Sequence, residues 1–255
     1  MASKVTLTPL CGIKLVEPGD DLGAIAVAAF AANGIAPEAG DVLVVAQKIV
    51  SKAEDRYVDV TAVEPSARAV ALAAEVDKDP RFVEVVLSES KRVVRYRPGL
   101  LIVEHRLGFV MANAGIDHSN LPAQGSGERV LLLPEDPDGS AHALREQLTG
   151  VFETDVAVII CDSFGRAWRK GTVGIALGAA GLPALIDLRG HPDLYGRELL
   201  VTETGFADEI AAAAGLLMGQ ADEAVPMVLV RGLNWSAPQV PAAALIRPAE
   251  HDLFR

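Results

Sequence analysis

The stretch DVAVIICDSFGRAWRKG, residues 155–171, decides how the rest of the chain is interpreted. Its apolar, β-branched run 156–160 predicts a strand buried on both faces, which is expected to end where Asp162 and Ser163 follow. Three cations come next between two glycines, namely Arg166, Arg169 and Lys170. Hard oxygen ligands suit Mg²⁺ or Mn²⁺, and a cationic loop suits phosphate groups. On this stretch alone, a strand end with an ordinary solvated loop is the slightly favoured interpretation.

The composition indicates a folded chain with an acidic balance. At 255 residues the chain is long enough for one large domain or two small ones. Half of the residues are hydrophobic, so a sizeable core is expected and disorder is not. The formal net charge of −11 argues against a nucleic-acid partner, which would need a broad basic patch.

The cysteine count and the hydropathy pattern predict a cytoplasmic protein. Cys11 and Cys161 are too few for a disulfide framework and are expected to be reduced thiols. Residues 1–10 lack the apolar run of a signal peptide. The alanine-rich run 211–214 is flanked by charges, so it predicts a packed helix, and no membrane span is expected.

Turn residues and apolar periodicity predict helices and strands without a regular alternation. Helices are expected at 22–33, 65–77, 138–150 and 207–218. Extended segments or strands are expected at 5–16, 42–46, 100–105, 109–112, 130–133, 198–204 and 227–231. Asp20 or Asp21 should cap the first helix, and Asp138 to Ser140 the third. The small residues at 171–181 indicate a close contact with a helix or a sheet.

Two further strand ends carry polar residues. The strand at 42–46 is expected to end in the polar run 47–52, where Lys48 and Lys52 stand four residues apart. A solvated edge and a lysine that contacts a nucleotide phosphate explain Lys52 equally well. In the run 113–120, an acid, a histidine, a hydroxyl and an amide follow small residues. A plain turn would not need all four, so a ligand-facing loop is expected there.

The common catalytic motifs do not occur in the sequence. Neither GxGxxG nor GxxxxGK[ST] is found, so any nucleotide site must be built differently. The lack of CxxC, HExxH and GxSxG argues against the usual zinc enzymes and serine hydrolases. The chain does offer hard oxygen ligands, namely Asp117, Asp162 and Ser163, with Gln220 or Asp222 as additions. Cations for phosphate are Lys52, Arg166, Arg169 and Lys170. These two sets together fit phosphoryl transfer with a metal ion.

Seven motifs identify a family. They are GIKLVEPGDDL (12–22), GDVLVVAQKIVSKAE (40–54), RLGFVMANAGIDHSN (106–120), LLLPEDPD (131–138), DSFGRAWRKG (162–171), GHPDLYGREL (190–199) and MGQADEAVP (218–226). With these motifs the chain resembles the coenzyme F420:γ-glutamyl ligase family, which attaches glutamate to a deazaflavin coenzyme precursor with GTP. The motifs cover nearly the whole chain in one order, so the resemblance does not depend on a single match.

The resemblance implies a fold and an assembly. The fold is expected to be α+β, with two domains, mixed sheets and helices in an arrangement peculiar to the family, and the assembly an intertwined homodimer. Residues 1–255 are expected to form one ligase module of two discontinuous subdomains, divided near residues 80 and 190. The nitroreductase-like second domain of some bacterial relatives is not expected.

The resemblance also implies site residues and a reaction. It places GTP against Ile13, Lys14, Leu15, Val16, Gln47, Lys52, Asn120, Met218, Gly219, Gln220, Ala221, Asp222, Glu223, Ala224 and Val225. It places Mg²⁺ or Mn²⁺, with K⁺ as a further ion, on Asp117, Asp162, Ser163 and Gln220. Catalytic roles fall on Asp117, Asp162 and Arg166. In the family, GTP is thought to activate a carboxylate of the precursor as an acyl phosphate, which the amine of L-glutamate then displaces. Further glutamates are joined through the side-chain carboxylate.

Four positions depart from the usual pattern of the family. Ser163 stands in place of threonine and keeps the hydroxyl. Asp55 and Ala224 stand where glycine is common, and both are expected near the nucleotide. Gly174 stands where many relatives carry an acid, so a ligand role at that position is missing.

Three functions compete on the sequence alone. The favoured one is a GTP-dependent ligase, which would consume GTP only when glutamate and a deazaflavin acceptor are both present. A metal-dependent phosphatase or nucleotide hydrolase that uses the same loops would release phosphate without them. A nucleotide-binding regulatory module would bind without turnover. The number and order of the motifs favour the ligase.

Overall fold

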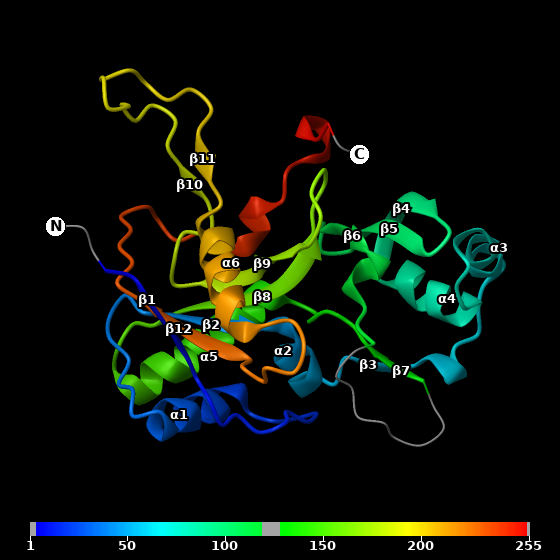
Figure 1. Cartoon of the computed structure of the whole chain (residues 1–255), viewed down its shortest axis with the longest axis horizontal. Coiled ribbons are helices and arrows are strands. Elements are labelled where there is room, and N and C mark those ends of the chain that lie inside the picture. Colours follow the sequence, from blue (N-terminus) through cyan, green and yellow to red (C-terminus); the bar gives the residue numbers. More distant parts are fainter. Residues whose placement is uncertain (1–3, 119–127, 254–255) are drawn as a thin grey trace.

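A five-stranded sheet forms the centre of the molecule, for which a computed structural model describes residues 4–118 and 128–253. Its strands lie in the order β1 (Thr6–Pro9), β12 (Met227–Arg231), β2 (Val42–Ala46), β8 (Ala157–Gly165) and β9 (Thr172–Ala180). β2 and β8 run parallel, whereas the other neighbours in this sheet are antiparallel. The strand predicted at 156–160 is therefore confirmed as a central strand (Figure 1).

Helices cover both faces of this sheet. On one face α1 (Leu22–Ala32) and α5 (Pro137–Phe152) pack against Leu43 and Val45 of β2. On the other face α6 (Phe206–Met218) packs against Val42 and Val44 of the same strand. Successive strand residues point to opposite faces, so a strand covered on both sides must be apolar throughout. Each fully buried side chain of this size contributes about 1.5–3 kcal/mol to stability.

Glycines of β9 allow the helices to approach closely. A Cβ atom on Gly178 would lie 2.0 Å from the carbonyl oxygen of Pro137, at the start of α5. A Cβ atom on Gly174 would lie 2.5 Å from the carbonyl oxygen of Ala211 in α6. The close contact predicted for 171–181 is confirmed. The backbone of α6 occupies the space that a side chain at position 174 would need, so an acid there would not fit this arrangement.

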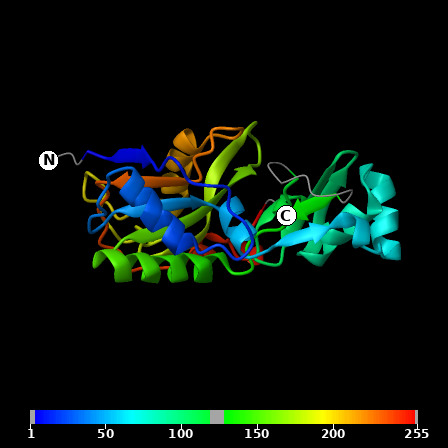
Figure 2. The same cartoon turned by 90° about the horizontal axis from the view of Figure 1, so that it is seen from below.

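Residues 57–118 and 128–132 pack around a hydrophobic core of their own. This part contains β3 (Tyr57–Asp59) paired with β7 (Arg129–Leu131), and a sheet of β4 (Ser90–Arg97), β5 (Leu100–His105) and β6 (Val110–Ala112). Its helices are α3 (Ala67–Val76) and α4 (Pro80–Ser88), with short 3₁₀ turns at Val60–Ala62 and Asn113–Gly115. Figure 2 shows the elongated shape that results, with this part at one end and the five-stranded sheet at the other. The mixed α+β class is confirmed, while the division into two subdomains near residues 80 and 190 stays a prediction.

A hairpin-like arm leaves the body of the molecule between residues 186 and 204. Its base is the short pair β10 (Ile186–Asp187) and β11 (Glu203–Thr204), and its loop extends away from the sheet (Figure 1). Four large apolar side chains in the arm are exposed, namely Leu194, Tyr195, Leu200 and Val201. The strand predicted at 198–204 is wrong over most of its length, since only Glu203 and Thr204 form a strand and Glu198 adds an isolated bridge to Pro192.

A charged cluster joins the two parts of the molecule. The Oε2 atom of Glu89 lies 3.1 Å from Nη2 of Arg56, 3.0 Å from Nε of Arg106 and 3.4 Å from Nε2 of His105. Arg56 Nε also donates to the carbonyl of Leu133 at 3.0 Å. Burial opposes ionisation of Glu89, but hydrogen bonds from His105 and Arg106 and the charges of both arginines lower its pKa from 4.5 to about 2.

Other elements largely follow the predicted pattern, with one correction at a helix start. Asp21 caps α1 through the amides of Gly23 and Ala24, as expected. The cap of α5 is Asp136, which accepts from the Gly139 amide, and not a residue of 138–140. The C-terminal region adds 3₁₀ turns at Ala242–Leu245 and Ala249–His251. Across the described residues, no helix combines the length and the apolar character needed to cross a membrane.

Replacing Gly178 by alanine tests the close approach of α5 to the sheet. The added methyl group would overlap backbone atoms of Pro137, so Gly178→Ala should lower the free energy of unfolding by about 2 kcal/mol, within the usual range for overpacking. Gly150→Ala is the matched control, because Gly150 lies in α5 with open space at its Cβ position. It should raise the free energy of unfolding by about 0.5–1 kcal/mol. Urea titrations of both variants measure this, and equal stabilities would contradict the packing argument.

Candidate active site

The parallel pair β2–β8 sets the position of the candidate site. Ala46, the last residue of β2, stands opposite Cys161 of β8. The chain turns directly after Ala46 into a helix, α2 (Gln47–Ala53), while β8 continues to Gly165 against β9. The carboxyl ends of parallel strands meet at one edge of a sheet, which is where open α/β sheets bind ligands. Asp162 therefore lies beside the first turn of α2.

Two expectations about this region are wrong. Residues 47–52 form a helix and do not extend the strand, and the spacing of Lys48 and Lys52 by four residues fits that helix. Asp162 and Ser163 lie inside β8 and not after it, because β9 pairs with β8 as far as Gly165. A strand end cannot be located from apolar residues alone when a hairpin partner extends the pairing beyond the core.

Two acids, Asp117 and Asp162, and Lys48 lie together at this edge, and the two acids are called the acid pair below. The Nζ atom of Lys48 lies 2.7 Å from Oδ2 of Asp117, and both side chains are about a quarter exposed. Asp117 is held by its backbone, which exchanges two hydrogen bonds of 2.9 Å with Leu131. The pKa of Asp162 is raised to about 7, mainly by burial; the charge of Asp117 acts in the same direction, whereas a hydrogen bond from the Ser163 amide and the charge of Lys48 act against it. The ion pair of Lys48 with Asp117, and the position of Asp162 beside the first turn of α2, place these three residues in one cluster.

Lys52 is the buried member of the same cluster. The residue is 7% exposed, so the solvated-edge interpretation is wrong. Burial lowers the pKa of Lys52, the charge of Lys48 lowers it further, and the charge of Asp117 acts in the opposite direction. Gln47 lies on the buried side of α2 as well, and its Oε1 accepts a hydrogen bond of 2.8 Å from Ser51 Oγ.

The loop 219–226 is anchored at both of its ends next to this cluster. Its first anchor is Met218, whose Sδ lies 3.7 Å from Sγ of Cys161 in β8. At the other end, the carbonyl of Pro226 accepts a hydrogen bond of 2.9 Å from the Ala46 amide. The structure thus brings the predicted nucleotide-binding loop to the edge where Asp162 and Gln47 lie.

The predicted N-terminal contact segment also passes this edge. The amide of Leu10 donates to the carbonyl of Met227 at 3.0 Å, and the amide of Gly19 donates to the carbonyl of Ala53 at 2.9 Å. Between these anchors Val16 is buried and Leu15 is 84% exposed. The Lys14 ammonium lies 2.9 Å from Oδ1 of Asp20.

Other predicted site residues do not join the cluster in the same way. Arg166 is exposed, and its Nη1 donates to the carbonyl of Gly171 at 3.1 Å within the β8–β9 loop. Arg169 and Lys170 are exposed on the same loop. Ser163 follows Asp162 in a strand, so its side chain points to the opposite face. Asn120 lies outside the described residues, so its predicted contact stays a prediction.

The donor set suits a hard divalent ion. Carboxylate, hydroxyl and amide oxygens are the ligands that Mg²⁺ and Mn²⁺ accept. Burial is the main cause of the raised pKa of Asp162, so a cation bound beside this carboxyl group would favour its ionised form. Within residues 4–118 and 128–253, no three His, Cys, Asp or Glu side chains converge, so this site would be completed by other oxygen ligands.

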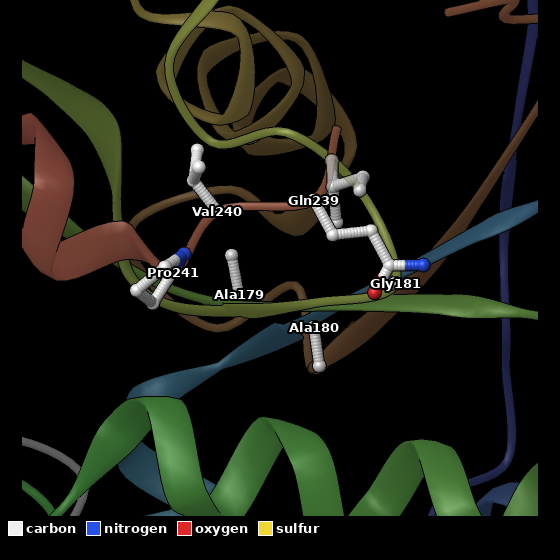
Figure 3. A pocket seen from close by; sticks show the side chains of 7 residues that line it. Ala179, Ala180, Gly181, Gln239, Val240 and Pro241 are labelled. Atoms are coloured by element: carbon white, nitrogen blue, oxygen red, sulfur yellow. The ribbon is translucent and has the colours of Figure 1, made fainter. Parts of the chain in front are cut away.

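Two cavities of the described structure lie to the side of the acid pair. The first, of about 180 Å³, is formed by small and apolar residues at the end of β9 and by 239–241. Figure 3 shows Ala179 facing this space and the amide of Gln239 reaching toward Gly181. It offers no ionisable lining residue. The second, of about 240 Å³, includes Ile175, which stands opposite Asp162 in the β8–β9 register.

Comparison with known proteins identifies the family. The family model described as F420-0:Gamma-glutamyl ligase matches residues 12–232. A coenzyme F420:L-glutamate ligase of Methanopyrus kandleri is 47% identical over 94% of this chain and 93% of its own length. The enzymes of that name from Methanothermobacter thermautotrophicus and Archaeoglobus fulgidus are 42% and 43% identical, over 98% and 99% of this chain and 99% and 97% of their own lengths.

The chain belongs to the F420-0:gamma-glutamyl ligase family. The resemblance inferred from the seven motifs is therefore confirmed, and the chain is an enzyme of the ligase class. The backbone conformation accounts for the usual preference for glycine at two positions where this chain departs from the ligase pattern. Asp55 and Ala224, which stand where glycine is common, both have a left-handed backbone, with φ of 52° and 53°. Glycine adopts this conformation without strain, so its frequency there has a steric cause.

Removing the negative charge of Asp162 tests the electrostatics of this ligase site. A carboxyl group whose pKa is raised from 3.8 to about 7 contributes stability below about pH 4 and loses it as the pH rises to about 7. Asp162→Asn should therefore stabilise the metal-free protein at pH 8, on the order of 2 kcal/mol, and the gain should disappear at about pH 4. Urea titrations with a chelator present, at several pH values, measure this. A gain of equal size at every pH would contradict the electrostatic cause.

Proposed function

We propose that this protein joins L-glutamate to the coenzyme F420 precursor, F420-0, through an amide bond, with GTP and a divalent metal ion. The observation that carries the proposal is the meeting of Lys48, Lys52, Asp117 and Asp162 at the carboxyl edge of β2 and β8. The names of the relatives, which are F420:L-glutamate ligases, support the choice of substrates. Addition of further γ-linked glutamates belongs to the same proposal.

The nucleotide is proposed to lie between α2 and the loop 219–226. Segments 13–16 and 218–225 pass this edge from two sides, and Gln47 and Lys52 face it from α2. Lys52 is suited to bind a phosphate group because it is buried, and a buried ammonium gains more from an anionic partner than an exposed one does. The backbone amides of the loop offer further donors for phosphate oxygens.

Asp117 and Asp162 are proposed to hold the divalent ion, with Gln220 as an additional oxygen ligand and K⁺ as a further ion. Ser163, whose side chain points to the opposite face of β8, would reach the same ion only through its backbone carbonyl oxygen. When bound, the ion would neutralise phosphate oxygens and favour attack at phosphorus. The residues of the chain have separate tasks: Asp117 is fixed by its two hydrogen bonds to Leu131, and Asp162 by the strand β8. Arg166 is proposed to bind an anionic group of the substrates, which requires its loop to turn toward the acid pair.

The proposed chemistry explains why a nucleotide is needed. A carboxylate is a poor electrophile, so the terminal carboxylate of the precursor is proposed to attack the γ-phosphorus of GTP, which releases GDP and forms an acyl phosphate. The amine of glutamate then attacks the acyl carbon, loses a proton and displaces inorganic phosphate. Both substrates are anionic and the protein carries a formal charge of −11, so the local lysines must offset an unfavourable background.

The exposed arm supports a homodimer. Leu194 is fully exposed and Tyr195, Leu200 and Val201 are 78–87% exposed, on a segment that extends from the body. Large apolar side chains gathered in one exposed segment mark a protein–protein contact. We propose that this arm packs on a second copy of the chain, in the intertwined homodimer that the family resemblance implies.

Coupling between nucleotide consumption and amide formation tests the reaction. With precursor, glutamate, GTP and Mn²⁺ present, phosphate release and product mass should rise together, because the acyl phosphate is consumed by the amine. Leaving out glutamate or the precursor should reduce phosphate release to background. Undiminished release in either case would favour a nucleotide hydrolase, and binding of GTP without turnover in the full mixture would favour a regulatory module. Replacement of GTP by ATP in the same assay measures nucleotide preference.

Lys52→Met tests the proposed phosphate contact. Methionine retains the bulk of the buried side chain and removes its charge, so GTP binding should weaken by about 1.5–3 kcal/mol, as for one charge-assisted hydrogen bond. Calorimetric titration of the nucleotide measures the change. Lys91→Met removes the same charge from an exposed position of β4 and should leave the affinity unaltered. Unchanged affinity in the Lys52 variant would transfer the role to Arg166, Arg169 or Lys170.

Light scattering tests the homodimer. The chain has a mass of 26.8 kDa, and we expect particles of twice that mass in solution. Combining Leu194→Ser with Leu200→Ser should shift the particles toward the monomer, because it removes apolar surface from the arm. Leu216→Ser, at an exposed site on α6, is the control and should not change the mass. A wild-type monomer that is still active would refute the dimer.

A further inference from the structure

We infer that Lys48 is the resident counter-ion of the Asp117–Asp162 pair, and that a divalent metal ion must displace it to bind. The inference rests on the proposed metal-dependent ligase function and deepens it. It gives a task to a residue that neither the motifs nor the chemistry of strand ends had assigned. Lys48 is then a positioning residue: it leaves Asp117 when the metal ion binds and contacts the nucleotide instead, which couples the two binding events.

The backbone fixes Lys48 at the acid pair. Lys48 is the second residue of α2, which begins directly after β2, and the Ala46–Cys161 register places this turn beside Asp162. Its Nζ atom lies 2.7 Å from Oδ2 of Asp117, a short distance that is typical of a charge-assisted hydrogen bond. The ammonium group thus holds an oxygen atom that the proposed metal ion would need.

The charge balance of the cluster makes simple addition of a metal ion unfavourable. When all four groups are ionised, Lys48 and Lys52 cancel the charges of Asp117 and Asp162. A divalent ion added to this arrangement would leave a surplus of two positive charges, with an ammonium group bound to the same carboxylate. Like charges at such short range repel strongly in a partly buried site. One lysine must therefore move away when the ion binds.

Lys48 is the lysine that can move. Its side chain is 24% exposed, so its four-carbon stem has room at the surface, whereas Lys52 is a buried residue. The flexible stem of a lysine allows the ammonium group to change partners without any movement of the backbone. A polyphosphate that lies between α2 and the loop 219–226 would offer the displaced ammonium group a new anionic partner.

Nucleotide and metal binding should therefore strengthen each other through Lys48. Without nucleotide, the metal ion must displace Lys48 into water. With nucleotide, the displaced ammonium group gains a phosphate oxygen. The difference is a coupling free energy between two ligands, and couplings of this kind typically change affinity by about 5- to 150-fold.

A purely structural role for Lys48 makes the opposite prediction. If the ion pair only orients Asp117 for the metal, its loss should leave the carboxylate poorly placed and weaken metal binding. If Lys48 competes with the metal, its loss should strengthen metal binding in the absence of nucleotide. The sign of the change separates the two roles.

The experiment is direct titration of Mn²⁺, followed by electron paramagnetic resonance of the free ion, on Lys48→Met and on the wild-type protein. We expect the variant to bind Mn²⁺ about tenfold more tightly without nucleotide. With a non-hydrolysable GTP analogue present, the enhancement of Mn²⁺ affinity should be smaller in the variant than in the wild type. Lys91→Met matches the change in total charge and should behave as the wild type. Lys48→Arg keeps the positive charge and should not show the tighter binding.

A double variant locates the effect. In an Asp117→Asn background a proposed metal ligand and the partner of Lys48 are both gone, so Mn²⁺ should bind more weakly and Lys48→Met should no longer strengthen that binding. Equal or weaker Mn²⁺ binding by Lys48→Met than by the wild type would overturn the inference while leaving the proposed function in place. Failure of the wild type to bind Mn²⁺, with and without the GTP analogue, would overturn the metal-dependent function and this inference together.

Discussion

The parallel hydrogen bonding of β2 to β8 is the constraint on which the rest of the structure depends. It aligns Ala46 with Cys161, two residues that are far apart in the chain, and it puts the start of α2 next to Asp162. A parallel pair must be covered on both faces, and α1, α5 and α6 provide that cover. Because β2 ends where β8 continues, the acid is left on a strand segment paired with β9. The packing of the core and the position of the candidate site thus both depend on the pairing of β2 with β8.

Much of the fold could be predicted because it depends on local signals. The β-branched runs at 42–46 and 156–160 became central strands, and Asp21 caps its helix as its position before Leu22 suggested. The helix at 47–53 was missed because Ile49 and Val50 continue a β-branched run. The recurrence of a lysine at 48 and 52, and of a buried polar residue at 47 and 51, was a helical period that could have revealed it.

The candidate site was only partly predictable, and the reasons are geometric. Residue types pointed to Asp117 and Asp162, and the structure brings both into one charged cluster. Lys48 could not be singled out, because its importance depends on a backbone register and on a distance to Asp117 that no local pattern encodes. The three cations of 166–170 were conspicuous in the sequence, yet they lie on an exposed loop where Arg166 contacts its own turn. Density of charge in a sequence does not measure nearness in space.

The charged cluster around Glu89 connects the two parts of the protein that supply the residues of the candidate site. Arg56, one of its members, follows α2 by three residues, and Arg106 belongs to the β5–β6 connection of the smaller part. Asp117 comes from that smaller part, whose core includes its neighbour Ile116, whereas Asp162 and both lysines come from the side of the five-stranded sheet. The candidate site is therefore divided by a seam, with one acid on each side. The ion pairs of Glu89 with Arg56 and Arg106 hold the two parts of the protein together close to that boundary. The angle between the two parts therefore determines the distance between Asp117 and Asp162.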